Sequence, residues 1–325
     1  MEKCEKAEFF EKISVFLEVR VKIPLGGVAF FDSGVGGLTV LNACANRFSG
    51  EKFYYYGDNE RAPYGNLPPT LIRRYTDEIF QAFSRLQVKG AVIACNTVTA
   101  LCVDELRAKY SFPIIGAEPA VATAAKAGGE IFVLTTRATF NSPRFRALCA
   151  NVAQNYPQAR LTPYSCDGLA GGIEEHIADS FYDFTRFLPC GSPRAVVLGC
   201  THYVYIKETI KNFYGCEVYD GNEGIARRLS TALKGDFYEQ KLSKIERSRD
   251  GRPPFSKAVG ESGICDHFLP PNQKIRIVKK KANKRSCIKI DKSLVINGVS
   301  SKNEFFFLGS GANKNKGFYE RMFVF

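Results

Sequence analysis

The sequence predicts an α/β fold with mainly parallel sheets, made of two pseudo-symmetric halves. Three observations carry this prediction. Short apolar runs alternate with segments of helical periodicity, which is the pattern of parallel sheets covered by helices. Each apolar run ends in a cluster of polar residues, and two of these run-plus-cluster segments resemble each other. Because ligands bind at the carboxyl ends of parallel strands, the polar clusters are the expected site.

The expected elements follow in chain order. The run GVAFF predicts a buried strand at 27–31, and the small and apolar residues after its glycine turn predict a helix at 38–47. An aromatic strand is expected at 52–56. The spacing of Ile72, Tyr75, Ile79 and Phe83 places them on one face of a helix at 70–86. The same reasoning gives strands at 91–94, 114–115, 131–134 and 195–198, and helices at 96–110 and 224–233.

Two segments read as distant copies of each other. AVIACNT at 91–97 and AVVLGCTH at 195–202 both run from an apolar strand into a cysteine and then into small polar residues. This duplication predicts two equivalent halves, each of which presents one thiol.

The chain is long enough for two domains, and its positive charge is concentrated near the end. The formal net charge is +12, of which residues 235–325 carry +10 (19 Lys and Arg against 9 Asp and Glu). We interpret 1–25 as an extension, 235–304 as a basic insertion, and 305–325 as a return to the fold through a strand at 304–308. The cluster 279–285 could contact phosphates, but a solvated charged segment is the preferred interpretation. We therefore do not expect a nucleic-acid partner.

Composition also indicates the compartment. The longest charge-free runs have 14 residues, 33–46 and 90–103, which is short of a membrane span. The first 25 residues lack the apolar core of a signal peptide. Eleven cysteines without a CxxC pair favour neither a disulfide framework nor a zinc ribbon. We expect a soluble cytoplasmic protein with reduced thiols and no membrane partner.

The glycine-rich stretch 32–37 (DSGVGG) does not match a nucleotide-binding loop. It lacks the GxGxxG spacing, and no Gly-Lys-Ser/Thr follows it. It offers a strand-end carboxylate from Asp32, a hydroxyl from Ser33 and backbone N–H groups. A ligand that carries both an ammonium and a carboxylate would suit this combination.

Cys95 and Cys200 differ from the other cysteines because each follows a strand and is expected to precede a helix. A helix N-terminus lowers the pKa of a thiol, which favours the thiolate. His202 follows Cys200 closely, and the three histidines show no metal-ligand spacing. A cysteine hydrolase would need one thiol only. Two facing thiols suit proton transfer on both faces of one carbon, as a racemase requires.

Four motifs together closely resemble the glutamate racemase family: FDSGVGGLTV at 31–40, YGDNERAPYG at 56–65, ACNTVTA at 94–100 and GCTHY at 199–203. The family belongs to the aspartate/glutamate racemase superfamily. The resemblance implies a fold of two similar α/β domains with the active site in the cleft between them. We place 26–96, 206–234 and 305–325 in the first domain and 97–205 in the second.

The resemblance also implies the site residues. Cys95 and Cys200 match the two acid/base thiols, and the carboxyl of Asp32 and the imidazole of His202 can tune these thiols. Glu174, eight residues after Cys166, matches an acidic residue that assists the second thiol. The positions that match substrate contacts in the family are Asp32, Ser33, Tyr64, Gly65, Asn96, Thr97, Thr136, Thr139, Thr201 and His202.

The activity that follows is interconversion of L- and D-glutamate without metal or other cofactor, which supplies D-glutamate for peptidoglycan. By family analogy, Cys95 acts on D-glutamate and Cys200 on L-glutamate. We also expect a homodimer. The alternatives are, in order, an aspartate or other amino-acid racemase of the superfamily, a cysteine hydrolase, and a nucleic-acid-binding protein that uses the basic segment.

Overall fold

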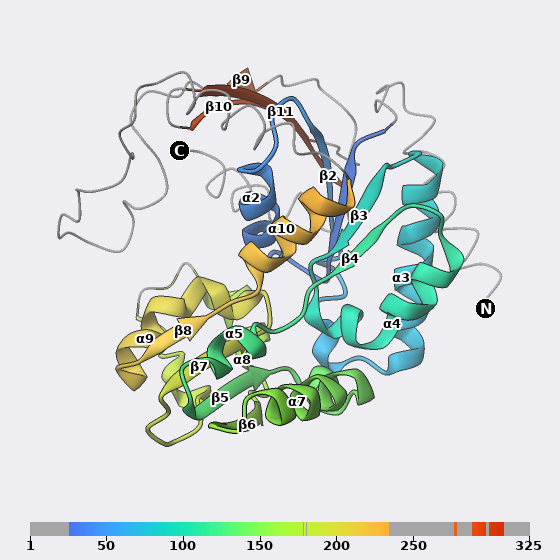
Figure 1. Ribbon diagram of the computed structural model, residues 1–325. Coiled ribbons are helices and arrows are strands. Elements are labelled where there is room, and N and C mark those ends of the chain that lie inside the picture. Colours follow the sequence, from blue (N-terminus) through green and yellow to red (C-terminus); the bar gives the residue numbers. More distant parts are fainter. Residues whose placement is uncertain are drawn as a thin grey trace, which may run out of the picture.

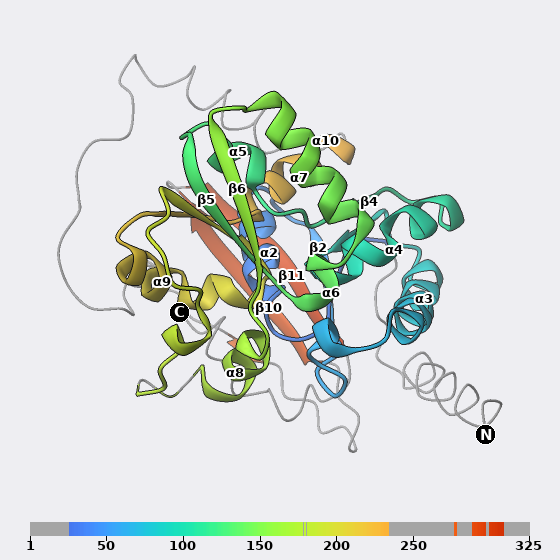
Figure 2. The same ribbon diagram turned by 90° about the horizontal axis from the view of Figure 1, so that it is seen from below.

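The computed structural model describes residues 26–177, 179 and 181–233, together with the strands at 276–277, 288–296 and 299–308. It contains two sheets, one in each half of the molecule, with helices packed against them (Figure 1). The predicted α/β fold with mainly parallel strands is confirmed. Figure 2 looks at the molecule from the side of the second half, with β5 and β6 in front of the strands of the first half.

The first sheet has seven strands in the order β4-β3-β1-β2-β11-β10-β9. The strands β4, β3, β1, β2 and β11 are parallel, and β10 and β9 are antiparallel to their neighbours. Their bounds are β1 Val28–Asp32, β2 Lys52–Gly57, β3 Gly90–Ile93, β4 Ile114–Gly116, β9 Arg276–Ile277, β10 Ile288–Ile296 and β11 Val299–Leu308. The strand expected at 304–308 is thus confirmed as the part of β11 that pairs with β2.

Helices cover both faces of the part of this sheet that β1, β2, β3 and β4 form, and the residues of these four strands are mostly buried. One apolar core packs α2 (Leu38–Ala45) and α10 (Asn222–Ala232) against the sheet. The other core packs α3 (Pro69–Arg85) and α4 (Asn96–Lys109) against the opposite face. A short 3₁₀ helix, η1 (Tyr64–Asn66), precedes α3. Fully apolar strands are expected for a parallel sheet that is covered in this way.

The second sheet has four parallel strands in the order β6-β5-β7-β8. Their bounds are β5 Gly129–Thr135, β6 Ala159–Ser165, β7 Ala195–Gly199 and β8 Glu217–Tyr219. The helices of this half are α5 Val121–Ala125, α6 Arg137–Phe140, α7 Pro143–Asn155, α8 Leu169–His176, η2 Thr185–Phe187, η3 His202–Ile206 and α9 Lys207–Tyr214.

The duplication expected from the sequence is visible in the topology. In both halves, the first four strands along the chain lie side by side in the order second, first, third, fourth. This order is β2-β1-β3-β4 in the first half and β6-β5-β7-β8 in the second. Cys95 follows the third strand of the first half, and Cys200 follows the third strand of the second half. The two thiols therefore occupy equivalent places in the two halves.

The strand pairing favours domain boundaries that differ from the expected ones. Residues 97–116 form α4 and β4, and β4 pairs with β3 in the first sheet. β8 pairs with β7 in the second sheet, although 206–234 was expected in the first domain. The chain crosses between the halves after β4 and after β8, so we propose boundaries near residues 117 and 220. The expected boundaries at 96 and 206 lie close to the two thiols, whereas the pairing of β4 with β3 and of β8 with β7 places the changes of sheet later in the chain.

Ion pairs join the halves beside the first crossing. The guanidinium of Arg144 on α7 lies 2.5 Å from Glu118 and 2.9 Å from Asp104 on α4. Arg228 on α10 also contacts Glu118, at 3.6 Å.

None of the helices in the described part of the chain is long and apolar enough to cross a membrane.

Candidate active site

Asp32, at the end of β1, organises the glycine-rich loop that follows it. Its Oδ2 accepts hydrogen bonds from the N–H groups of Gly34 (3.2 Å) and Gly37 (3.0 Å). Its Oδ1 accepts a hydrogen bond from the Thr201 hydroxyl, which comes from the second half, at 3.3 Å. Burial raises the pKa of the Asp32 carboxyl above its usual value, against the opposing effects of His202 and the two N–H groups. Asp32 therefore shapes the loop and links the two halves.

Cys95 is buried immediately before α4, and its Sγ lies 3.5 Å from the Ser33 Oγ. Burial, with smaller contributions from Asp32 and Cys200, raises the pKa of the Cys95 thiol to about 12. The expectation that the helix N-terminus would favour the thiolate is wrong here. The N–H of Val98 and the Ser33 hydroxyl lower the pKa of Cys95, but loss of water costs the thiolate more.

Cys200 has a different set of partners. Its Sγ lies 3.8 Å from Nδ1 of His202, and Nε2 of His202 lies 2.6 Å from Oε1 of Glu174 on α8. Contrary to expectation, no α-helix begins directly after Cys200; the 3₁₀ helix η3 begins at His202, and α9 begins only at Lys207.

The three side chains form a charge-coupled set. Burial alone would lower the pKa of His202, but its hydrogen bonds to Cys200 and Glu174, and their charges, raise it well above its usual value. Burial alone would raise the pKa of Glu174, but the hydrogen bond and charge of His202 bring it below its usual value. The imidazole of His202 is thus held between the carboxylate of Glu174 and the sulfur of Cys200.

The glycines of the loop allow this set to approach it. The N–H of Val35 donates to Oε1 of Glu174 at 3.0 Å. A Cβ atom on Gly34 would lie 1.8 Å from the same oxygen, and one on Gly36 would lie 2.5 Å from the Thr201 hydroxyl. Gly34 and Gly36 are therefore explained by the close approach of Glu174 and Thr201 to the loop, whereas the sequence had indicated only a turn or a ligand-binding loop.

Three threonine hydroxyls form a second polar group. Oγ1 of Thr136 lies 2.9 Å from that of Thr97 and donates to that of Thr139 at 3.1 Å. Gly65 packs against this group, since a Cβ atom there would lie 2.8 Å from Cβ of Thr136. Tyr64 is placed differently, because its ring is buried in the first half and its hydroxyl donates to the buried Asp58.

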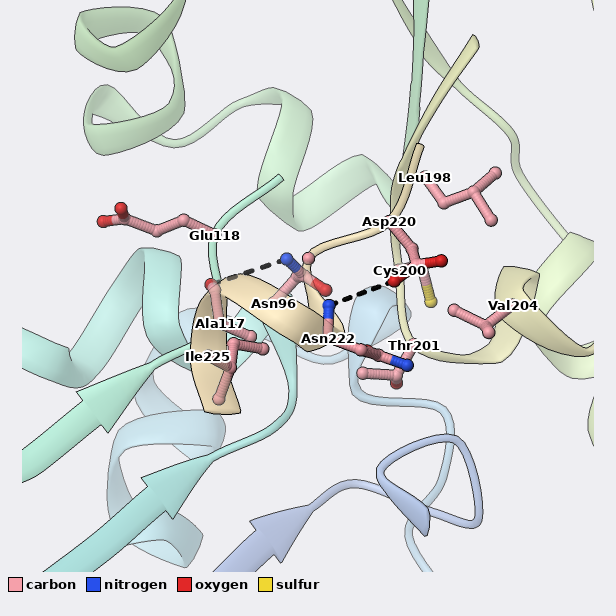
Figure 3. Close-up of a pocket in the computed structure, with 11 residues that line it drawn as sticks. Asn96, Ala117, Glu118, Leu198, Cys200, Thr201, Val204, Asp220, Asn222 and Ile225 are labelled. Carbon is pink, nitrogen blue, oxygen red and sulfur yellow. Dashed lines mark hydrogen bonds between the residues drawn. The ribbon is translucent and has the colours of Figure 1, made fainter. Parts of the chain in front are cut away.

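Asn96 lines a small pocket at the crossing between the halves. Its side-chain amide donates to the carbonyl of Ala117 at 3.4 Å, as Figure 3 shows. Cys200 and Thr201 line the same pocket, with Asp220 and Asn222 from the second crossing. The pocket has space for about one water molecule.

The structure thus brings most of the expected residues together. Cys95 contacts Ser33, and the neighbouring Asp32 accepts a hydrogen bond from Thr201, which follows Cys200. Cys200 is also close enough to contribute to the raised pKa of Cys95. Sequence reasoning missed Asp58, Tyr55 and Tyr205, whose hydroxyl or carboxyl groups hold the loops around the site. Tyr55 and Tyr205 bond to backbone carbonyls, which no motif indicates, whereas Asp58 lies in the motif at 56–65, six residues before its partner Tyr64.

The arrangement is suited to acid–base chemistry. Two thiols with different partners lie at equivalent strand ends of facing halves, among hydroxyl and N–H donors in a buried setting. Among the described residues, no cluster of three or more His, Cys, Asp or Glu side chains could hold a metal ion.

Comparisons with known proteins agree with this geometry. The family model Asp/Glu/Hydantoin racemase matches residues 38–229. A glutamate racemase of Clostridium botulinum (strain Loch Maree) is 36% identical over 242 residues, which is 69% of this chain and 92% of that protein. One from Clostridium perfringens is 34% identical over 229 residues, or 67% and 86% of the two chains.

Solved structures give the same result. Glutamate racemase RacE1 of Bacillus anthracis superposes with a TM-score of 0.56 at 28% identity, covering 66% of this chain and 82% of that one. The Escherichia coli glutamate racemase in complex with L-glutamate and the activator UDP-MurNAc-ala gives a TM-score of 0.57 at 26% identity, covering 65% and 83%. The family-model match spans more than half of the chain, so this protein belongs to the Asp/Glu/Hydantoin racemase family.

Proposed function

We propose that this protein is a glutamate racemase, which interconverts L- and D-glutamate by proton transfer at Cα between two thiols. The observation that carries the proposal is the pair of buried cysteines at equivalent strand ends of the two halves, each with its own polar partners. Relatives and solved structures that are named glutamate racemases support glutamate as the substrate.

In the direction from L-glutamate, the Cys200 thiolate removes the α-proton while the Cys95 thiol donates a proton to the opposite face. Cys95 is suited to this role because its raised pKa keeps it protonated. His202, which is hydrogen-bonded to Glu174, lies beside the Cys200 sulfur. In the reverse direction Cys95 must act as the base, and the α-ammonium of the bound substrate lowers the cost of its thiolate.

The α-proton of an amino acid is weakly acidic, so the carbanion needs fixed donors in a site that excludes water. We assign this role to Ser33, Asn96, Thr97 and Thr201, with Asp32 holding the loop. Thr136, Thr139 and Gly65 line the neighbouring wall, and Tyr64 contributes through its backbone because its hydroxyl is bonded to Asp58.

The cellular role that follows is supply of D-glutamate for peptidoglycan in the cytoplasm. We further propose that the protein acts as a homodimer, which sedimentation of the purified protein would test.

The direct test is to incubate the full-length protein with L- or D-glutamate, without pyridoxal phosphate, and to follow both enantiomers by chiral chromatography. Both reactions should approach an equal mixture, and aspartate should react much more slowly. Racemisation of aspartate in preference to glutamate would favour the other amino-acid racemases of the family. No racemisation of either substrate by folded protein would refute the proposal. The Cys102→Ala variant, which lacks another buried thiol of α4, is the matched control.

A further inference from the structure

One peptide group of the glycine-rich loop is held by hydrogen bonds at both of its polar atoms. The carbonyl of Gly34 accepts a hydrogen bond from the Tyr55 hydroxyl at 2.7 Å. The N–H of Val35, which belongs to the same peptide group, donates to Oε1 of Glu174 at 3.0 Å. Tyr55 lies on β2 in the first half, and Glu174 lies on α8 in the second. The Gly34–Val35 peptide therefore connects the two halves.

The connection continues to a thiol. Oε1 of Glu174, which accepts from Val35, also lies 2.6 Å from Nε2 of His202, and Nδ1 of His202 lies 3.8 Å from Sγ of Cys200. A hydrogen bond to a peptide carbonyl polarises the peptide and strengthens the bond that its N–H donates. A continuous chain of contacts therefore links the Tyr55 hydroxyl on β2 to Cys200 in the opposite half.

We propose that Tyr55 is a positioning residue for Cys200, acting through the Gly34–Val35 peptide, Glu174 and His202. The kinetic part of this inference rests on the proposed two-thiol racemisation. Tyr55 is fully buried with Val35 in the core beneath the loop, so its hydroxyl has a fixed direction. Tyr55 fixes the Gly34–Val35 peptide, which can lie close to Glu174 only because Gly34 has no Cβ atom.

Tyr205 provides a second anchor of the same loop. Its hydroxyl donates to the carbonyl of Val35 at 2.7 Å, and it lies on η3, three residues after His202. The peptides on both sides of the Val35 Cα are therefore held by tyrosines, one from each half.

The Cys95 side does not depend on these anchors in the same way. Its partner Ser33 lies at the start of the loop, where Asp32 accepts from the N–H groups of Gly34 and Gly37. Loss of the Tyr55 hydroxyl should therefore affect Cys200 more than Cys95.

The chain offers a matched control in Tyr54, the neighbouring residue of β2. It is also fully buried, and its hydroxyl donates to a backbone carbonyl at the same distance, 2.7 Å, but that carbonyl belongs to Gly26 at the far end of β1. Tyr54→Phe and Tyr55→Phe remove equivalent groups from opposite faces of one strand. A merely structural role predicts equal effects of the two changes.

The first measurement does not depend on activity. Alkylation of the full-length protein by iodoacetamide at pH 7.5 is followed separately at Cys95 and Cys200 by peptide mass spectrometry. Tyr55→Phe should slow alkylation of Cys200 by about fivefold, the factor that corresponds to one ordinary hydrogen bond. Cys95 in this variant, and both thiols in Tyr54→Phe, should remain within about twofold of wild type, the scatter expected for a change not coupled to the thiol. Unchanged Cys200, or equal slowing in both variants, would overturn the proposal.

The second measurement separates the two faces of the substrate. Racemisation has an equilibrium constant of one, so kcat/KM must be equal in both directions, and only a half-reaction can reveal a one-sided effect. Elimination of chloride from the L- and D-isomers of 3-chloroglutamate provides such half-reactions. Tyr55→Phe should slow elimination from the L-isomer more than from the D-isomer, and an equal effect on both isomers would contradict the positioning role.

A third variant protects the test against misfolding. If Tyr55→Phe does not fold, Tyr205→Phe should produce the same selective slowing at Cys200. Its control is Tyr214→Phe, whose hydroxyl donates to the carbonyl of Pro189. Should wild-type protein fail to racemise glutamate, the proposed function fails, while the alkylation rates still decide whether Tyr55 positions Cys200.

Discussion

Replacing either Cys95 or Cys200 by alanine should abolish racemisation but leave elimination from one enantiomer. Removal of the α-proton of 3-chloroglutamate and departure of chloride form an enamine, which water converts to 2-oxoglutarate and ammonium. This half-reaction needs a base on one face only. Cys95→Ala should therefore still eliminate from the L-isomer through Cys200, and Cys200→Ala from the D-isomer through Cys95.

The surroundings of the thiols set the magnitudes. A positioned acid or base contributes about 10²–10⁴-fold to a rate, so each variant should lose at least about 10²-fold in racemisation, since one face of the substrate loses its donor or acceptor. With a pKa of about 12, Cys95 pays roughly 7 kcal/mol to form its thiolate at pH 7. Elimination from the D-isomer should therefore accelerate as the pH rises.

The assay follows 2-oxoglutarate with a coupled dehydrogenase. Cys102→Ala, which loses a buried thiol elsewhere on α4, should keep racemisation and both eliminations. The two-thiol reasoning is refuted if both variants keep, or both lose, elimination from the same isomer. A hydrolase with a single catalytic thiol would not produce opposite preferences in the two variants.

Four further predictions follow from the same contacts. Glu174→Gln should slow elimination from the L-isomer by roughly 10–100-fold, as expected when a hydrogen bond to a charged group is weakened, whereas Glu175→Gln, at an exposed position, should not change it. Gly34→Ala should impair the same half-reaction, because its Cβ atom would lie 1.8 Å from Oε1 of Glu174. The control is Gly224→Ala, whose Cβ atom would have no other heavy atom within 4 Å; it should leave activity unchanged, and calorimetry should show no lower melting temperature. Alkylation of Cys95 should rise about tenfold per pH unit from pH 7 to 10 without a plateau, because the thiolate fraction grows in this proportion below a pKa of about 12; a plateau near pH 8.5 would contradict the raised pKa. Racemisation should survive EDTA treatment and dialysis, and activity that returned only with an added metal or cofactor would contradict the cofactor-independent mechanism.

The strands that surround the thiols could be predicted from sequence because each is an apolar run with an abrupt polar end. The runs at 91–94 and 195–198 correspond to β3 and β7 within one residue at each end. β6 could not be predicted in this way, since it contains Arg160 and Pro163 and is partly exposed. Its place at the edge of the second sheet explains why it tolerates proline. β8 has three residues and gives no clear pattern.

The site was predictable in composition but not in electrostatics. The positions of Cys95, Cys200 and His202 in motifs identified them as partners in chemistry. The sequence could not indicate how much water Cys95 would lose, and this loss reverses the effect of the helix N-terminus on its pKa. The link from Tyr55 to Glu174 was also hidden, because it passes through the backbone of a loop.

One duplicated frame therefore carries two unequal acid–base groups. Cys95 lies near the carboxylate of Asp32, which opposes its ionisation, whereas Cys200 lies beside a histidine that is paired with Glu174. Under the proposed mechanism, Cys95 carries a proton in the free enzyme, as the direction from L-glutamate requires. The inequality cannot change the equilibrium between the enantiomers, because that equilibrium is fixed at one. It means instead that D-glutamate must meet a Cys95 that has already lost its proton, or promote that loss through the charge of its own ammonium group.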